Sequence, residues 1–114
     1  MSKYLAVQLS SGGRSLVLAD NIINISKGGG TTDEVIITYN NYITDWAGKA
    51  TGITIKFSGN FGLGDDSILS TLADLVMEAQ TIDAPFLTVP SPLYGVTDEN
   101  GNPLRMLFIN VNKS

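Results

Sequence analysis

Apolar and polar residues alternate along several short segments of the chain. In residues 4–9, for example, Leu5, Val7 and Leu9 share one face. Successive side chains of a β-strand point to opposite faces, so a period of two predicts a strand. Similar alternation, or a run of β-branched residues, recurs at residues 15–19, 22–25, 34–39, 53–58 and 104–111. We therefore expect a mainly β protein with strands at these positions.

Turn-forming residues lie between these segments. Residues 10–13 read Ser-Ser-Gly-Gly, which predicts a tight turn because glycine adopts positive φ at little cost. The strands on either side of this turn are expected to pair as a hairpin. Asp20 and Asn21 predict a bend or bulge before the next strand.

The pattern changes after residue 59, where the apolar positions follow the spacing of one helical face. The residues on this face are Ile68, Leu69, Leu72, Leu75, Val76 and Ala79. They predict one amphipathic helix over residues 67–80. Asp65, Asp66 or Ser67 is expected to supply the N-cap oxygen.

Three prolines follow the helix, at Pro85, Pro90 and Pro92. Proline cannot donate to a strand ladder, so this stretch is expected to be extended and to lie at a sheet edge. Together the elements predict a small, strongly bent antiparallel sheet or a partly open barrel of five to seven strands, with one α-helix at its end. A chain of 114 residues, 43% of them hydrophobic, suits one core, so residues 1–114 are expected to form a single domain.

The chain contains no histidine and no cysteine. This removes Ser-His-Asp and Cys-His catalytic groups, and it leaves zinc only carboxylates, which structural zinc sites rarely use. Seven basic and eleven acidic residues give a formal charge of −4, the wrong sign for a surface that neutralises many phosphates. We expect no enzyme, no cofactor and no metal site, and nucleic acid is a disfavoured partner.

Residues 59–64, Gly-Asn-Phe-Gly-Leu-Gly, lie between a predicted strand and the predicted helix. Backbone amides in such a turn can face a phosphate. However, Asp65 and Asp66 would oppose an anion, and the spacing matches neither the Rossmann nor the P-loop pattern. A structural turn is therefore the main interpretation, and a small-ligand site in this loop is an alternative.

Asp98, Asn100 and Asn102 have the alternate spacing that opens a calcium-binding loop. Pro103 and Ile109 stand where that loop requires glycine and glutamate. The pattern therefore favours an exposed hairpin loop over a calcium site.

The first nine residues alternate in polarity, and no later stretch approaches the roughly 18 apolar residues of a membrane span. We therefore expect no membrane partner and a location in the cytoplasm or in a virus particle.

One segment of about twenty residues has the spacing of the first signature of the Sm-like proteins, which are small, bent barrels that often assemble into rings. The matching positions are Val7, Gln8, Leu9, Gly13, Leu16, Asp20 and Asn24. The segment resembles that family, which implies an Sm/SH3-like barrel. The chain departs from the family pattern at Ser15, where a second glycine is expected, and at residues 105–109, which lack the family's Arg-Gly pair. Its predicted helix also comes late, whereas the family usually begins with one. In general composition the chain is similar to short reading frames of marine phages and environmental samples, which implies a virion or assembly role.

The leading functional hypothesis is a non-enzymatic structural or assembly subunit that forms a symmetric homo-oligomer. Only 16% of the residues are charged, against roughly 25% in typical domains, and an open barrel leaves strand edges to pair. The contacts are expected on the outward face of residues 104–111 and on residues 86–89. The side chains proposed for this contact are Phe86, Leu87, Val89, Met106 and Phe108.

An alternative hypothesis is an Sm-like module that binds single-stranded RNA through a local basic patch and stacking aromatic rings. The residues proposed for this surface are Lys27, Lys49, Lys56, Arg105, Tyr42 and Trp46.

Overall fold

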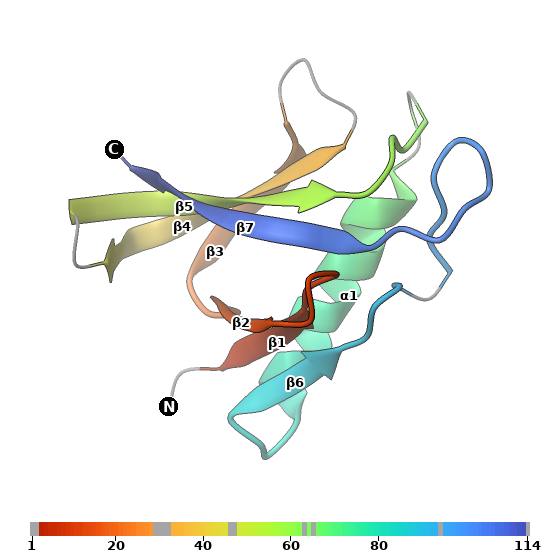
Figure 1. Ribbon diagram of the computed structural model, residues 1–114. Coiled ribbons are helices and arrows are strands. Elements are labelled where there is room, and N and C mark those ends of the chain that lie inside the picture. Colours follow the sequence, from red (N-terminus) through yellow and green to blue (C-terminus); the bar gives the residue numbers. More distant parts are fainter. Residues whose placement is uncertain are drawn as a thin grey trace.

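A computed structural model describes residues 3–28, 33–45, 48–62, 64, 66–93 and 95–113, and in these residues it shows two β-sheets and one helix (Figure 1). The small sheet has the strand order β2-β1-β6. Its strands are β1 (Tyr4–Gln8), β2 (Arg14–Leu18) and β6 (Phe86–Val89). The large sheet has the order β3-β4-β5-β7. Its strands are β3 (Ile22–Lys27), β4 (Glu34–Asp45), β5 (Gly48–Phe57) and β7 (Met106–Lys113).

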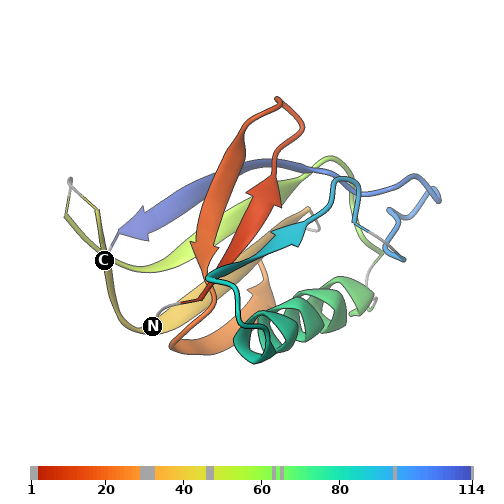
Figure 2. The ribbon, with the colours of Figure 1, turned by 90° about the horizontal axis from the view of Figure 1, so that it is seen from below.

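The helix α1 (Ser67–Thr81) lies beside β6, β1 and β3 (Figure 2). Its buried residues are Ile68, Leu72, Val76 and Ala79, all of which belong to the apolar face that the sequence predicts. The predicted helix is therefore confirmed, and it ends one residue later than expected.

The hydrophobic core lies between the inner faces of the two sheets and the buried face of α1. Alternation along each strand turns every second side chain inward, as expected for sheets with one face on a core. Among the most buried side chains are Leu5, Val7, Val17 and Val89 of the small sheet and Val35, Ile37, Ile55 and Phe57 of the large sheet.

The two sheets are joined at two places. After Ala19 the chain leaves the small sheet through Asn21, whose φ is 61°, and enters β3. The end of β1 meets the start of β7, where the Ser10 amide donates to the Met106 carbonyl oxygen at 2.9 Å. Across the first junction the Tyr39 hydroxyl donates to the Leu18 carbonyl oxygen at 2.7 Å. The expected bend at residues 20–21 is thus confirmed as the point where the chain changes sheet.

The expectation of a mainly β fold with one helix is confirmed, and the sheets do not close into a barrel. The expectation of an all-antiparallel sheet is wrong, because β6 pairs with β1 in parallel, with Phe86 opposite Tyr4. The reason is topological, because α1 follows the large sheet in the sequence and precedes β6. Such a helical connection allows β6 to enter the small sheet in the same direction as β1.

The Tyr39 side chain offers a direct test of how the sheets are held together. Replacing Tyr39 with phenylalanine leaves the Leu18 carbonyl without this donor and should lower the free energy of unfolding by about 1–2 kcal/mol in a denaturant titration. Tyr4→Phe is the matched control, because Tyr4 is only half-buried, and it should change the same quantity by less than about 0.5 kcal/mol. Equal effects of the two variants would contradict the role of Tyr39.

Burial also raises the pKa of Tyr39 above its ordinary value of 10.0. Above about pH 10 the phenol therefore ionises in the unfolded chain while it stays protonated in the folded one, so folding stability falls as the pH rises. Stability of the native protein should fall more steeply between pH 10 and the upper limit of measurement than that of Tyr39→Phe. Parallel curves for the two proteins would show that this phenol does not titrate differently on unfolding.

Candidate functional site

Six large apolar side chains are exposed among the residues that the structure describes. These are Leu16, Ile23, Met77, Phe86, Phe108 and Val111. Exposed apolar residues that gather on one surface often mark contact sites, whereas scattered ones need no explanation. The six divide between three surfaces, namely the outer face of the small sheet, the strand β7, and a groove between β3 and α1.

The outer face of the small sheet is defined by its register. Tyr4 stands opposite Leu18 on one side and Phe86 on the other, and Ala6 stands opposite Leu16 and Thr88. Cross-strand partners share a face, so this face is opposite to the one on which Leu5 and Val7 enter the core. Leu18, at the end of β2, is partly buried and also packs against the core. The outer face therefore comprises Tyr4, Ala6, Gln8, Arg14, Leu16, Leu18, Phe86 and Thr88.

This outer face is apolar across all three strands. Leu16 is 61% exposed and Phe86 43%, while Tyr4 and Leu18 are half-buried. The Arg14 guanidinium carbon lies 5.9 Å from the centre of the Phe86 ring, a cation–π distance. Arg14 lies on β2 and Phe86 on β6, and Ala6 lies on β1 between them. The Arg14 side chain must therefore pass over β1 to reach the Phe86 ring. This covers Ala6, which is buried although it is on the outer face. A sheet of this kind usually leaves one face polar, and here the outer face carries exposed apolar side chains beside its polar ones.

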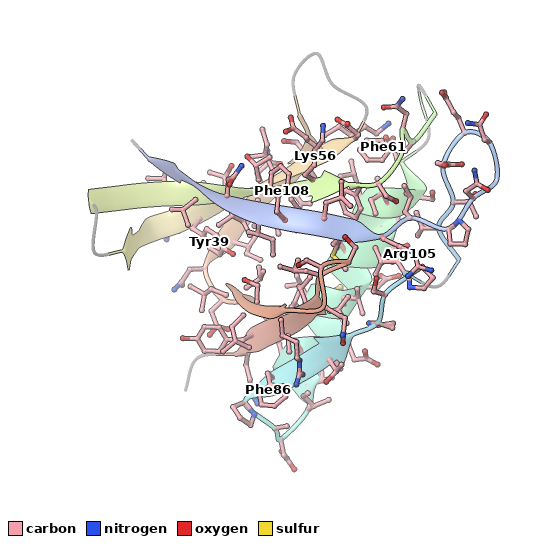
Figure 3. All side chains as sticks on the ribbon, viewed as in Figure 1. Tyr39, Lys56, Phe61, Phe86, Arg105 and Phe108 are labelled. Atoms are coloured by element: carbon pink, nitrogen blue, oxygen red, sulfur yellow. The ribbon has the colours of Figure 1, made fainter. Side chains whose placement is uncertain are left out.

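The exposed side chains of β7 lie in different surroundings. Phe108 is opposite Lys56 and shares the outer face of the large sheet with it (Figure 3). Lys56 forms an ion pair with Asp33, in which its ammonium group donates a hydrogen bond to the carboxylate. This hydrogen bond raises the pKa of Lys56. Val111 is opposite Ile53 and therefore points to the other side of the sheet. Among the described residues, Phe108 is thus an exposed aromatic residue beside charged groups.

The third surface is an open groove of about 470 Å³ between β3 and α1. Ile22, Ile23 and Ile25 line it from the strand, and Leu69 and Ala73 from the helix.

The structure separates the five side chains that the sequence proposes for self-association. Phe86 and Phe108 are exposed and lie on different sheets (Figure 3). Leu87 is half-buried opposite Leu5, on the inner face. Val89 and Met106 are buried in the core, so their proposed contact with a partner is wrong.

The reasons for these two corrections differ. Val89 is opposite Val7 on the inner face of the small sheet. Met106 is opposite Phe57 while Phe108 is opposite Lys56, so a bulge at Leu107 turns Met106 inward and Phe108 outward.

The residues proposed for RNA binding are also placed apart or paired. Lys27 forms an ion pair with Asp66 at 3.1 Å, and its ammonium lies 5.8 Å from the centre of the Phe61 ring. Lys56 is paired with Asp33, as described for β7, and Arg105 is exposed before that strand. Trp46 and the side chains of Tyr42 and Lys49 lie outside the described residues. Two of the cations proposed for a basic patch are thus neutralised by carboxylates.

The glycine-rich loop is anchored to the core by Phe61. This buried ring meets Phe57 edge to face, with ring centres 6.1 Å apart. Asp66 occupies the N-cap position, but its side chain makes no capping hydrogen bond, so it is not the one of the three candidate residues that supplies a cap oxygen. The carboxylate instead pairs with Lys27. Leu63 and Asp65 lie outside the described residues.

The loop at residues 97–103 uses its aspartate to hold a turn. One oxygen of Asp98, Oδ1, accepts hydrogen bonds from the amides of Asn100 and Asn102, at 2.9 and 2.8 Å. Such an Asx-type turn is a structural role for the carboxylate. Within the described part of the chain, no three histidine, cysteine, aspartate or glutamate residues are grouped so that they could hold a metal ion.

A second concave surface of about 430 Å³ lies among Pro90, Pro92 and Pro103, with Leu93 and Val96. Ser91 also lines it, and its hydroxyl oxygen is buried and has no hydrogen-bond partner among the described residues.

The outer face of the small sheet was not predicted from the sequence, although a signal for it was present. Residues 16–18 read Leu-Val-Leu, so Leu16 and Leu18 lie on one face and Val17 on the other. Apolar residues on both faces of a strand indicate that both faces are covered, either within the fold or by a partner.

No family model, curated protein or solved structure matches this chain. In the described ranges, no helix combines the length and the hydropathy needed to span a bilayer.

Gly59 offers a test of the packing between the glycine-rich loop and the Asp98 turn. A Cβ at Gly59 would lie 2.7 Å from Asp98 Oδ2 and 3.0 Å from its Cβ, so Gly59→Ala must displace the turn. We expect a loss of about 1–3 kcal/mol in the free energy of unfolding. Gly13→Ala is the control, since a Cβ there meets nothing within 4 Å, and it should be neutral or slightly stabilising. A neutral Gly59→Ala would show that the two loops do not pack as described.

Proposed function

We propose that this protein is a non-enzymatic structural or assembly subunit that forms a symmetric homo-oligomer through the outer face of the small sheet. The observation that carries the proposal is the exposure of Leu16 and Phe86 on a sheet whose inner face already belongs to the core. Leaving a second apolar face in water is unfavourable, at about 25 cal/mol per Å² of apolar area.

A second copy of the same face is a suitable partner for chemical reasons. A two-fold contact brings one surface patch against itself, so the patch must be free of strong like-charge repulsion. Arg14 is the one charged residue on the outer face, and its guanidinium already lies over the Phe86 ring. Aromatic and arginine side chains are the types most enriched at the energetic centres of interfaces.

The polar residues of the face lie where an interface rim requires them. At one end of the sheet, Gln8 is opposite Arg14, and Thr88 lies toward the same end on β6. At the other end, Tyr4 lies between Leu18 and Phe86. An apolar centre with polar residues beside it is the usual anatomy of a stable contact. The proposal thus retains the hypothesis of self-association and places it on β1, β2 and β6.

Phe86 and Phe108 provide a matched pair for the test, because each residue is 43% exposed. Light scattering over a range of protein and salt concentrations should show a discrete oligomer whose mass does not depend on salt. Phe86→Ser should raise its dissociation constant at least about tenfold, the effect of losing an interface side chain worth about 1.4 kcal/mol. Phe108→Ser should leave the mass unchanged.

Two results would contradict the proposal. One is a native protein that remains monomeric at every concentration. The other is dissociation by Phe108→Ser but not by Phe86→Ser, which would assign the contact to β7.

A further inference from the structure

β3 and α1 lie side by side and run in opposite directions, and they are tied together at both ends (Figure 2). At one end Lys27 forms its ion pair with Asp66, the residue before the helix. At the other end the Gln80 side-chain amide donates to the Ala19 carbonyl oxygen at 2.9 Å. Six residues of strand span about 20 Å, and the helix from residue 66 to residue 80 spans about 21 Å. The two elements therefore lie side by side, and they flank a groove that is lined by residues 22–25 of the strand and residues 69–73 of the helix.

Most of the residues that line the groove are apolar, and its polar members are Asn24 from the strand and Ser70 from the helix. The remaining helix lining is Leu69 and Ala73. Ile23, 63% exposed, projects at a bulge of β3. Met77 follows Ala73 by four positions, so it continues the same helix face toward Gln80, and it is also exposed. These side chains provide apolar contacts for a short extended ligand beside residues 22–25.

The backbone of β3 provides the second feature of the groove. β3 is an edge of the large sheet, and its other side pairs with β4. The Gly28 amide donates to the Glu34 carbonyl oxygen. In an antiparallel pair, residues that hydrogen-bond to the neighbouring strand alternate with residues that do not. The N–H and C=O groups of Ile25 and Lys27 therefore point away from β4. An edge strand of this kind is a template for the addition of another strand.

The charges around the groove select the partner. Asp74 and Glu78 are the charged residues of α1, both are acidic, and both are exposed. Asp74 is four positions after Ser70, and therefore lies at the rim of the groove. The cation at the groove, Lys27, is already paired with Asp66, and the whole chain carries a formal charge of −4. A basic partner is therefore attracted to this surface and an acidic one repelled.

We propose that this groove binds an extended segment of a partner protein in which apolar and basic residues alternate. The segment adds to β3 as a further strand and places the apolar side chains of one face against Ile23, Ile25 and Ala73. The basic side chains of its other face are attracted by the negative potential of Asp74 and of the chain as a whole. This binding site is separate from the outer face of the small sheet and does not depend on the oligomer proposed above.

The probe for this site is a synthetic peptide of about seven residues that alternates lysine and valine and has blocked ends. Titration into ¹⁵N-labelled protein, followed by NMR, should give saturable shifts of the amides of Ile25, Lys27, Ser70 and Ala73. A peptide with glutamate in place of lysine should bind at least about tenfold more weakly, because it meets like charges. A peptide with proline at alternate positions should give no saturable shifts, because it cannot donate to the edge of β3.

Ile23 and Leu16 form a matched pair of variants, since both are strand residues with about the same exposure, 63% and 61%. Ile23→Ser should weaken the lysine–valine peptide at least about fivefold, the effect of losing one apolar contact. Leu16→Ser should leave the affinity unchanged, because Leu16 lies on the outer face of the small sheet. Asp74→Asn should weaken binding about threefold at low salt and have little effect at high salt, as expected for an exposed charge.

Three results would overturn the proposal. The first is the absence of saturable shifts at the groove, and the second is equal affinity for the lysine and glutamate peptides. The third is dissociation of the protein's own oligomer by Ile23→Ser, because this would make the groove a contact between copies of the chain.

Discussion

The two sheets bury their inner faces against each other without closing into a barrel, and α1 fills the side that they leave open. Ile68, Leu72 and Val76 supply the helix contribution to this core. Burial of each such side chain contributes about 1.5–3 kcal/mol. The sheets are held in place by the Tyr39–Leu18 hydrogen bond and by the contact of Ser10 with Met106. The core therefore requires both sheets and the helix at once.

Two sheets that do not close into a barrel leave strand edges, and these edges have different surroundings. β3 is flanked by α1, which converts its edge into a groove. β7 carries Phe108 beside the Lys56–Asp33 ion pair, and charged groups of this kind discourage association at an edge. The small sheet has only three strands, so its outer face and both of its edges remain available. The proposed peptide groove thus lies at an edge that barrel closure would have paired, whereas the proposed contact between copies lies on an outward sheet face.

The elements that the sequence predicts well are those with one buried face. The strand at residues 4–9 and the helix show a clear period because each packs on the core from one side only. The long hairpin of β4 and β5 extends beyond the predicted strands, because residues 40–50 are mostly polar and show no alternation. Parallel pairing of β6 with β1 joins residues about eighty positions apart, and no local pattern encodes such a contact.

The candidate sites were predicted less well than the fold, for a related reason. A single extra residue at Leu107 reverses which side of β7 faces the core, so Met106 and Phe108 cannot share a surface as strict alternation implies. The groove depends on α1 lying beside β3, about forty positions earlier in the chain. The outer face of the small sheet was also not predicted, although the Leu-Val-Leu pattern at residues 16–18 offered a local signal for it.

The most direct test of self-association is to measure which methyl groups a soluble gadolinium chelate can reach as the protein concentration rises. Leu16, Ile23 and Val111 all carry exposed methyl groups, and each lies on a different surface. If the small sheet forms the contact between copies, the relaxation enhancement of the Leu16 methyls falls with concentration while that of Ile23 and Val111 is constant. Equal accessibility of Leu16 at all concentrations, or shielding of Val111 alone, would contradict the account.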